Sequence, residues 1–148
     1  VHSTAEKTRV VKGALTDVNE AIRFVAETGV DTLAISIGNC HGLYEAALHY
    51  DLLQQLRQAI DIPLVLHGGS GIKTEDIRRL IAGGINDVNI DSELRQAFTL
   101  TLKQTIQEKP TELDPRVLIA PCRRAVARVV EDKMDEFGVS GKANGHII

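Results

Sequence analysis

Blocks of apolar and polar residues alternate along this chain and predict alternating helices and strands. Three short apolar runs, at residues 32–38, 63–66 and 85–90, are closed by glycine or polar residues. The first two runs are almost wholly apolar, which is typical of parallel strands covered on both faces. We therefore expect three strands.

Apolar residues spaced three and four positions apart predict five helices around these strands. The expected ranges are 16–29, 50–60, 74–84, 92–110 and about 114–137. In the first helix, Ala21, Ile22 and Val25 form the expected buried stripe. Pro121 falls inside the last helix and is expected to kink or split it, because its ring removes a backbone donor and clashes with the preceding turn.

Residues suited to helix ends support these ranges. Thr16 or Asp17, Thr74 and Asp114 are the expected N-caps, since their side-chain oxygens can accept from first-turn amides. Outside the predicted elements, residues 1–14 are expected to be a loop or disordered arm and residues 140–148 a mobile tail. Residues 15–139 remain as the folded part.

The element order predicts an α/β fold with right-handed parallel crossovers. Three strands cannot close a barrel, and a complete (β/α)8 barrel needs about 200 to 250 residues. With 148 residues, this chain is expected to form about half of such a barrel, that is, a partial TIM barrel.

The composition of the chain limits the classes of molecule that we expect it to bind. The formal charge is −3, the basic residues are scattered and no tryptophan is present. We therefore expect a small-molecule ligand and neither nucleic acid nor an acidic membrane surface as partner. Cys40 and Cys122 fit neither a disulfide framework nor a metal clip and indicate a reducing compartment. With neither a signal peptide nor a long apolar span, we expect a cytoplasmic protein.

Polar residues follow the expected strands at the edge where parallel α/β folds build their sites. His41 and His67 each stand beside glycine at a strand end. Two such imidazoles can share a zinc ion, although a catalytic zinc needs a third protein ligand. Alternatively, each histidine only satisfies a backbone carbonyl. Cys40 could be a soft ligand or a reactive thiol, but we favour a small buried residue there.

The segment after His67 predicts an anion site. Gly68, Gly69 and Ser70 allow close approach of the backbone and offer unpaired N–H groups, and a helix start follows. The third strand ends near Asn89, followed by Asp91 and Ser92.

Three segments carry a family resemblance. IGNCHGLY (residues 37–44), PLVLHGGSGI (63–72) and VNIDSELR (88–95), in this order and spacing, resemble the C-terminal motifs of the class II, zinc-dependent ketose-bisphosphate aldolases. Asp-Pro-Arg at residues 114–116 is similar as well. The resemblance covers about residues 15–139 and implies the C-terminal half of a TIM barrel.

The resemblance also implies an activity and a set of site residues. The activity is reversible aldol cleavage of a ketose 1,6-bisphosphate, of the fructose or tagatose type, to dihydroxyacetone phosphate and an aldehyde phosphate, a reaction of glycolysis and carbohydrate metabolism. His41 and His67 would bind Zn²⁺, and Gly42 would line the substrate site and a site for a monovalent cation, Na⁺ or K⁺. Gly68, Gly69 and Ser70 would hold the phosphate, Asn89 would face the enediolate, and Asp91 and Ser92 would complete the phosphate pocket.

Arg116 matches an arginine that in some members reaches a neighbouring subunit's site, which implies a homo-oligomer or a complementing N-terminal barrel half as protein partner. A solvated arginine at a helix start is the alternative. His2, His49 and His146 receive no role.

Three departures from the family pattern affect the expected activity. The chain contains no Asp-His pair to supply the third zinc ligand and the proton-transferring aspartate, residues 1–13 do not reproduce the mobile loop, and Asp87 replaces the usual lysine. We therefore expect the isolated chain, as a truncated product or one piece of a nicked barrel, to be inactive. The alternatives are a non-catalytic sugar-phosphate-binding or assembly module and an unrelated phosphate-binding barrel.

Overall fold

The structure is a computed structural model that describes residues 14–39 and 47–142. The chain divides into two compact units, Val1–Ile90 and Asp91–Ile148, and each is described by itself. No helix among the described residues is both long and apolar enough to cross a membrane.

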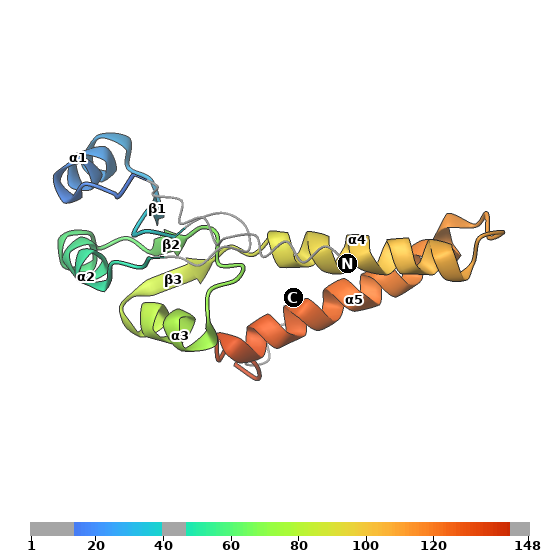
Figure 1. Cartoon of the computed structure of the whole chain (residues 1–148). Helices are drawn as coiled ribbons and strands as arrows, with labels where there is room; N and C mark the ends of the chain where they lie inside the picture. The colour runs from blue at the N-terminus through green and yellow to red at the C-terminus, as the bar shows by residue number, and fades with distance from the viewer. Residues whose placement is uncertain (1–13, 40–46, 143–148) are drawn as a thin grey trace, which may run out of the picture. The chain divides into compact units, whose positions relative to one another are not determined.

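The first unit alternates helices and strands in the predicted order. Its elements are α1 (Val18–Thr28), β1 (Leu33–Ile35), α2 (Tyr50–Ala59), β2 (Leu64–Leu66), α3 (Thr74–Ala82) and β3 (Ile85–Val88). The strands form a parallel sheet in the order β1-β2-β3. Figure 1 shows α1, α2 and α3 stacked in chain order beside the strands. The predicted parallel α/β arrangement is confirmed.

The core of this unit lies between β2 and the helices. Side chains less than 2% exposed come from both layers: Leu53, Leu56, Leu64, Leu66, Ile77 and Leu80. β2 is buried along its whole length, as its apolar sequence predicts.

Two residues that the sequence predicts to be buried are exposed, one in β1 and one in α1. Ala34 of β1 is exposed, because β1 has a neighbouring strand on only one side in the described sheet. In α1, Ile22 is 42% exposed, and of the predicted stripe only Ala21 is buried. A first helix and an edge strand have fewer elements to pack against than α2 and β2 do.

The helix caps largely follow the sequence. Asp17 caps α1 by accepting from the Glu20 amide at 2.9 Å, and Asp114 accepts from the Arg116 amide at 2.9 Å. Thr74 is not a cap: it is the first residue of α3, after Lys73. The reason is that the Lys73 carbonyl already accepts from the Ile77 amide at 3.0 Å, so the helical ladder starts one residue early.

A bulge sets the register between β2 and β3. Leu64 pairs with Ile85 but Val65 pairs with Asp87, so Asn86 is the extra residue. The Asn86 side-chain oxygen accepts from the Leu64 amide at 3.1 Å and so satisfies a backbone group that the bulge would leave unpaired. Because side chains alternate along a strand, this insertion decides which face Asp87 and Asn89 occupy.

The second unit is an antiparallel pair of helices, α4 (Ser92–Glu108) and α5 (Pro115–Glu136), which Figure 1 shows side by side. Their contact buries Thr105 and Cys122. α5 runs through Pro121 as one helix, so the expected split is wrong. The ring costs a helix about 3 kcal/mol, and we attribute the continuity to packing of α5 along α4.

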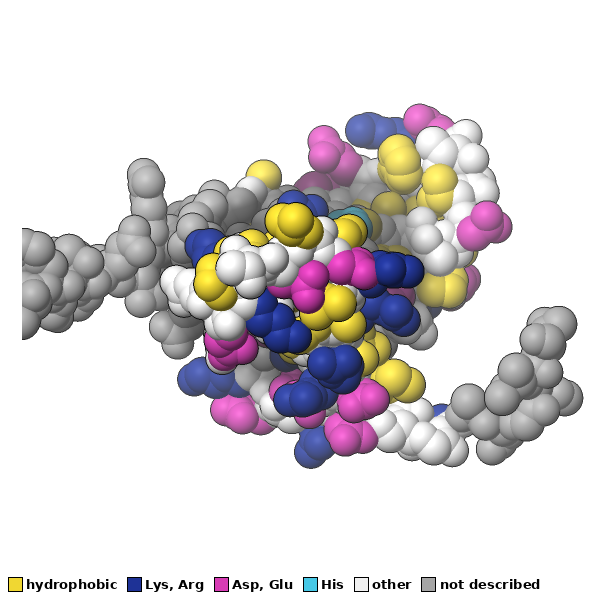
Figure 2. All heavy atoms as spheres, turned by 90° about the vertical axis from the view of Figure 1, so that its right-hand side faces the viewer, with side chains coloured by type: hydrophobic (Ala, Val, Ile, Leu, Met, Phe, Trp, Pro, Cys, Tyr) yellow, Lys and Arg dark blue, Asp and Glu magenta, His cyan; other side chains and the backbone are white. Residues whose placement is uncertain are grey.

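Charges of both signs share the exposed surface with hydrophobic side chains. Figure 2 shows Lys and Arg interspersed with Asp and Glu on the face that it presents, with hydrophobic groups between them. Leu113 in the α4–α5 connection is 90% exposed, the highest value among the large hydrophobic residues that the structure describes.

Candidate functional site

The carboxyl ends of β1 and β2 are tied together by one side chain. Asn39 donates from Nδ2 to the His67 carbonyl at 2.8 Å, and its Oδ1 accepts from the Ile37 amide at 2.8 Å. Ile37 is fully buried, whereas His67 is exposed. Asn39 therefore fixes the backbone from which the His67 side chain projects.

Sequence reasoning placed Asn39 in a turn and missed this function. The available signal was an asparagine directly after a buried strand and a glycine, where an Asn side chain often bonds backbone two residues away. The bond across to His67 had no sequence signal, since it joins residues 28 positions apart.

The glycine turn after His67 packs tightly against the end of β3. The Gly69 amide donates to the Asn89 carbonyl at 3.1 Å. A Cβ on Gly69 would lie 2.5 Å from Val88 Cγ1 and 2.8 Å from Ile90 Cδ1, closer than side chains tolerate. Gly68 and Gly71 have positive φ angles of 68° and 80°, which glycine adopts without strain. The turn is therefore a close backbone approach.

This packing corrects one detail of the predicted anion site. The Gly69 N–H was expected to be unpaired, but it is used by the Asn89 carbonyl, because the turn continues the ladder between β2 and β3. Ser70 is 2% exposed, so its hydroxyl does not face solvent. The Gly69 N–H is therefore not available to an anion while this bond is made.

The backbone of Asn89 continues the hydrogen-bond ladder between β2 and β3, and its side-chain amide is exposed just after β3. Its N–H donates to the Leu66 carbonyl at 2.9 Å, while its exposed side chain donates from Nδ2 to Asp87 Oδ2 at 3.4 Å. The candidate catalytic amide thus lies beside the carboxylate of Asp87.

The second unit carries the remaining described site residues at two helix starts. Asp91 precedes α4 but makes no side-chain capping bond, and its carboxylate pairs with Arg95 at 2.8 Å. Arg116 lies in the first turn of α5 and pairs with Asp114 at 2.7 Å, and its side chain is 89% exposed. Hydrogen bonds from the Arg116 side chain and backbone hold the pKa of Asp114 below its usual value.

Of the two histidines expected to bind zinc, the structure describes His67. His41 and Gly42, like Cys40, lie outside the described residues. Within residues 14–39 and 47–142, no three His, Cys, Asp or Glu side chains gather as a metal site. His67 supplies an imidazole of the right chemistry for zinc, and the described residues by themselves do not complete the ligand set.

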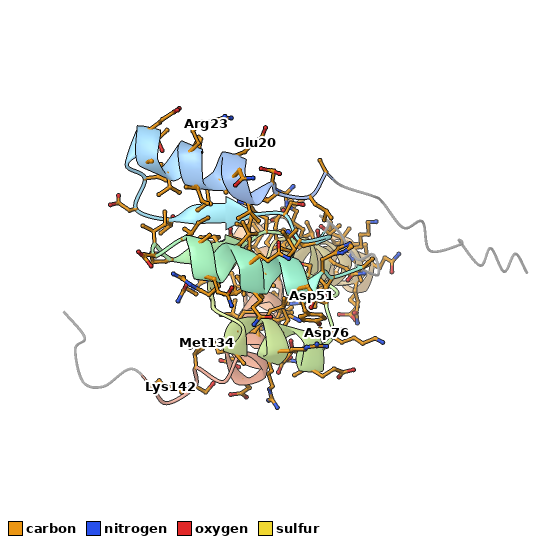
Figure 3. All side chains as sticks on the ribbon, turned by 90° about the vertical axis from the view of Figure 1, so that its left-hand side faces the viewer. Glu20, Arg23, Asp51, Asp76, Met134 and Lys142 are labelled. Carbon is orange, nitrogen blue, oxygen red and sulfur yellow. The ribbon has the colours of Figure 1, made fainter. Side chains whose placement is uncertain are left out.

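A separate cavity of about 570 Å³ lies at the start of α2 and is lined by Leu15, Leu48, His49, Tyr50, Asp51, Leu52, Gln55 and Arg79. The Tyr50 hydroxyl donates to Asp76 Oδ1 at 2.6 Å, and the Arg79 guanidinium stacks 3.7 Å from the centre of the Tyr50 ring. Figure 3 shows Asp51 and Asp76 at neighbouring ends of α2 and α3. Tyr50 therefore links these two helices.

This link predicts a loss of stability in alkali. Burial, followed by the hydrogen bond to Asp76, raises the pKa of Tyr50 from 10.0 to about 12. A group whose folded pKa is raised stabilises the fold below its unfolded pKa, so this contribution should be lost as the pH rises from 10 through 12. Phenolate absorbance of the wild type minus that of Tyr50→Phe should titrate near pH 12. A midpoint near pH 10 would contradict the link; Tyr44, the other tyrosine, remains in both proteins.

Comparison with known proteins places these features in a family. The sequence profile of the class II fructose-bisphosphate aldolases matches residues 1–142, a wider span than the three motifs indicated. The fructose-bisphosphate aldolase of Geobacillus stearothermophilus is 42% identical over 129 residues, which are 86% of this chain and 45% of that protein.

Solved structures of aldolases are also similar to this chain. The crystal structure of the YdjI aldolase from Escherichia coli K12 matches with a TM-score of 0.72 and 37% identity, over 86% of this chain and 46% of that one. Fructose-bisphosphate aldolase from Campylobacter jejuni matches with a TM-score of 0.68 over 84% of this chain and 46% of that chain; at 21% identity it supports the fold alone.

The chain thus spans slightly less than half the length of these relatives. The matches confirm the predicted α/β fold, with three parallel strands forming part of a (β/α)8 barrel. They also confirm the resemblance carried by the motifs around His67 and Asn89. The chain belongs to the class II fructose-bisphosphate aldolase family.

Proposed function

We propose that this chain, as the C-terminal half of a barrel over residues 15–139, serves a zinc-dependent aldolase that cleaves a ketose 1,6-bisphosphate of the fructose or tagatose type. The family match motivates the activity. One structural observation connects this activity with particular residues: the turn at His67–Gly69 is hydrogen-bonded to Asn89 on one side and to Asn39 on the other.

In this proposal, His41 and His67 bind Zn²⁺, which when bound supplies Lewis-acid polarisation of the substrate carbonyl. A third ligand comes from outside this chain, because its sequence holds no Asp-His pair. Asn39 orients His67 through the His67 backbone, since its amide holds that carbonyl at 2.8 Å.

The phosphate of dihydroxyacetone phosphate is bound by the backbone of Gly68, Gly69 and Ser70, where glycine removes the side chains that would keep a ligand away. Gly69 contributes by shaping the turn, because its N–H donates to the Asn89 carbonyl and its lack of a Cβ lets the turn lie against Val88 and Ile90. Asn89 holds its amide toward the reacting oxygen atoms, and Gly42 lines the substrate site and an Na⁺ or K⁺ site.

In the second unit, Asp91 and Ser92 contribute to phosphate binding at the start of α4. Support comes from the absence of a side-chain cap by Asp91, which leaves the described first turn of α4 without that competing acceptor. Arg116 binds the far phosphate of a neighbouring subunit's substrate, so a homo-oligomer or a complementing barrel half is the protein partner. Its pairing with Asp114 would have to open for that contact.

The cytoplasm is the proposed location, where the free thiol of Cys122 would remain reduced. The second candidate function is a non-catalytic sugar-phosphate-binding module. The observation in its favour is Asp87, whose carboxylate is 3.4 Å from the Asn89 amide and would disfavour a negatively charged enediolate, and so catalysis, at that amide.

Calorimetric titration of this chain with dihydroxyacetone phosphate separates the two functions. The aldolase proposal predicts that zinc strengthens binding and that a chelator reverses the gain, whereas the binding module predicts no effect of metal. The chain alone should not cleave fructose 1,6-bisphosphate even with zinc, because it lacks the proton-transferring aspartate. Metal-independent binding would contradict the aldolase proposal, and turnover by a monomer would contradict the assignment of that aspartate to another segment.

A further inference from the structure

The side of β1 that faces away from β2 is an open strand edge, and we call it the outer edge of β1. The Leu33 amide donates to the Pro63 carbonyl at 3.0 Å, so the backbone groups of Leu33 face β2. Because these groups alternate sides along a strand, those of Ala34 face away from β2. In the described part of the chain, no strand pairs with Ala34 on this side.

The residue two positions further along the chain supports this alternation. Ser36 bonds to Thr16 rather than to β2: its carbonyl accepts from the Thr16 amide at 2.9 Å, and its own amide donates to Thr16 Oγ1 at 2.8 Å. Thr16 thus occupies the outer edge beside Ser36. Ala34 is the position of β1 at which a further strand can pair.

A groove of about 360 Å³ lies beside the same edge and is lined by residues of α1, of the segment before it and of β1. Its side chains include the apolar Leu15, Ala21, Phe24 and Leu33 and the acidic Asp17 and Glu20. Leu15 is 45% exposed and Phe24 is 49% exposed. Figure 3 shows Glu20 on α1, at one end of the stack of three helices. Exposed apolar side chains and an open strand edge therefore occur together at this end of the first unit.

The crossovers within this unit indicate what fits there. α2 leads from β1 to β2 and α3 leads from β2 to β3, and each crossover joins strands that are neighbours in the sheet. α1 leads into β1 in the same way, so the corresponding strand would lie parallel to β1 on its outer edge. α1 packs against α2, and a helix that precedes such a strand would pack against α1 in turn. The groove is the space open to that helix.

We propose that the outer edge of β1 and the groove beside α1 bind a parallel strand and a helix of the complementing barrel half. This inference rests on the proposed function, in which that half is the protein partner. The docked strand bonds to the N–H and C=O of Ala34, and the helix covers Phe24 and Leu33 with apolar side chains. Basic residues on the helix suit Asp17 and Glu20.

The size of the relatives agrees with this occupant. The chain spans slightly less than half the length of the aldolases that it matches, so each of those proteins contains a further segment of the required size. A second copy of this chain fits less well. Identical edges that meet across a two-fold axis run antiparallel, whereas the crossovers call for a parallel strand, and the second copy would bring further acidic side chains to the interface.

The test measures binding of the part of the Geobacillus stearothermophilus aldolase that its match with this chain does not cover. The two segments are co-expressed and purified through a tag on the Geobacillus segment. Analytical ultracentrifugation over a dilution series then gives their dissociation constant, without zinc or substrate. The wild-type chain should co-purify with that segment as a one-to-one complex.

Ala34→Pro tests the strand edge. Proline removes the N–H that faces away from β2 and leaves the bonds to β2, since edge strands tolerate proline on their open side. The dissociation constant should rise about tenfold, because a hydrogen bond to the partner is lost. Ala34→Ser keeps the N–H and should stay within about twofold of the wild type. Both variants alone should melt within about 4 °C of the wild type.

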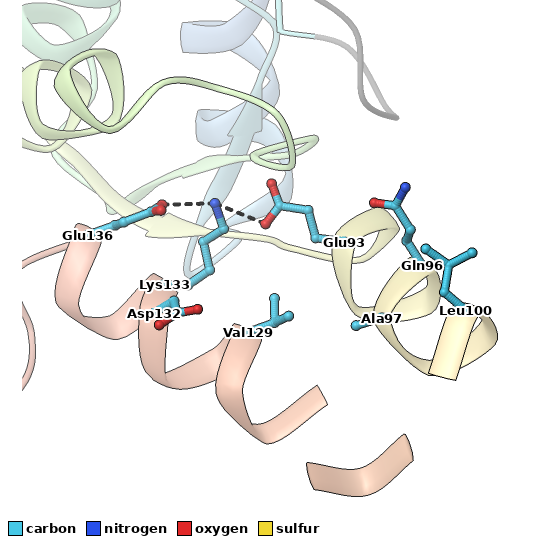
Figure 4. A pocket seen from close by; sticks show the side chains of 8 residues that line it. All are labelled: Glu93, Gln96, Ala97, Leu100, Val129, Asp132, Lys133 and Glu136. Atoms are coloured by element: carbon cyan, nitrogen blue, oxygen red, sulfur yellow. Dashed lines mark hydrogen bonds and ion pairs between the residues drawn. The ribbon is translucent and has the colours of Figure 1, made fainter. Parts of the chain in front are cut away.

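Phe24→Ser tests the groove and decides if Ala34→Pro does not fold. It should also raise the dissociation constant about tenfold, because an apolar contact with the partner is lost. The matched control is Leu100→Ser, which should leave the dissociation constant unchanged. Leu100 is 57% exposed and lines a groove of about 290 Å³ between α4 and α5, where Figure 4 shows it.

Failure of the inference and failure of the proposed function give different results. If the Geobacillus segment binds the wild type, Ala34→Pro and Phe24→Ser equally well, the docking surface is wrong and the partner stands. If it does not bind the wild type, the complementing half is wrong as partner, and zinc-dependent binding of dihydroxyacetone phosphate still tests the aldolase activity separately. A dimer of the chain alone that Ala34→Pro dissociates would make a second copy the occupant and overturn the proposal.

Discussion

Replacing Gly69 with alanine should lower the free energy of unfolding by about 3 kcal/mol, the upper end of the range for overpacking a core. The added Cβ would lie 2.5 Å from Val88 Cγ1 and 2.8 Å from Ile90 Cδ1, so the turn after β2 and the end of β3 must separate. The Gly69–Asn89 hydrogen bond would lengthen with them. Urea unfolding at constant m-value measures the loss.

Gly29→Ala provides the matched control within the same unit. Gly29 has a positive φ of 63° and no atom within 4 Å of an added Cβ, so its substitution meets backbone strain but no steric clash. That strain costs about 1 kcal/mol. If Gly69→Ala cost no more than Gly29→Ala, the close approach between the glycine turn and β3 would be wrong.

The second large effect is expected at Asn39. Asn39→Ala removes the acceptor of the buried Ile37 amide and the donor to the His67 carbonyl. An unsatisfied buried backbone group costs about 1 to 3 kcal/mol, so we expect a total loss of about 2 to 3 kcal/mol. Hydrogen exchange at the Ile37 amide should become faster, since that amide would lose its only partner among the bonds described for it.

Asn39→Asp separates the two bonds. Aspartate keeps an oxygen for the Ile37 amide but cannot donate to the His67 carbonyl, and it places a negative charge beside that carbonyl. Exchange at Ile37 should therefore stay slow while the His67 turn loosens and about 1 kcal/mol of stability is lost. Equal exchange at Ile37 in the alanine and aspartate variants would show that Asn39 does not hold this amide.

Local sequence patterns were enough to predict much of this fold. The apolar run before His67 indicated a buried strand, and β2 is buried at every position. Asp17 and Gly29 marked both ends of α1, because a capping oxygen and a left-handed glycine are local requirements. Such features depend on neighbours in the sequence, so the sequence contains the information for them.

The details of the site depend on contacts between distant residues, and they were not predictable. The Asn39 bond to His67 and the Gly69 bond to Asn89 join separate strands. The bulge at Asn86 was also missed, since an asparagine in a short apolar run resembles an ordinary strand residue. The motif around His67 pointed to the correct family, but only the structure shows that the Gly69 N–H is already engaged.

We propose above all that the turn after β2 and the end of β3 bind the phosphate of a sugar phosphate. Amide chemical-shift mapping of the labelled chain with zinc and dihydroxyacetone phosphate tests it most directly. The largest shifts should fall on Gly68, Gly69, Ser70 and Asn89. Shifts confined to the cavity beside Tyr50 and Arg79, or no shifts with saturating ligand, would contradict it.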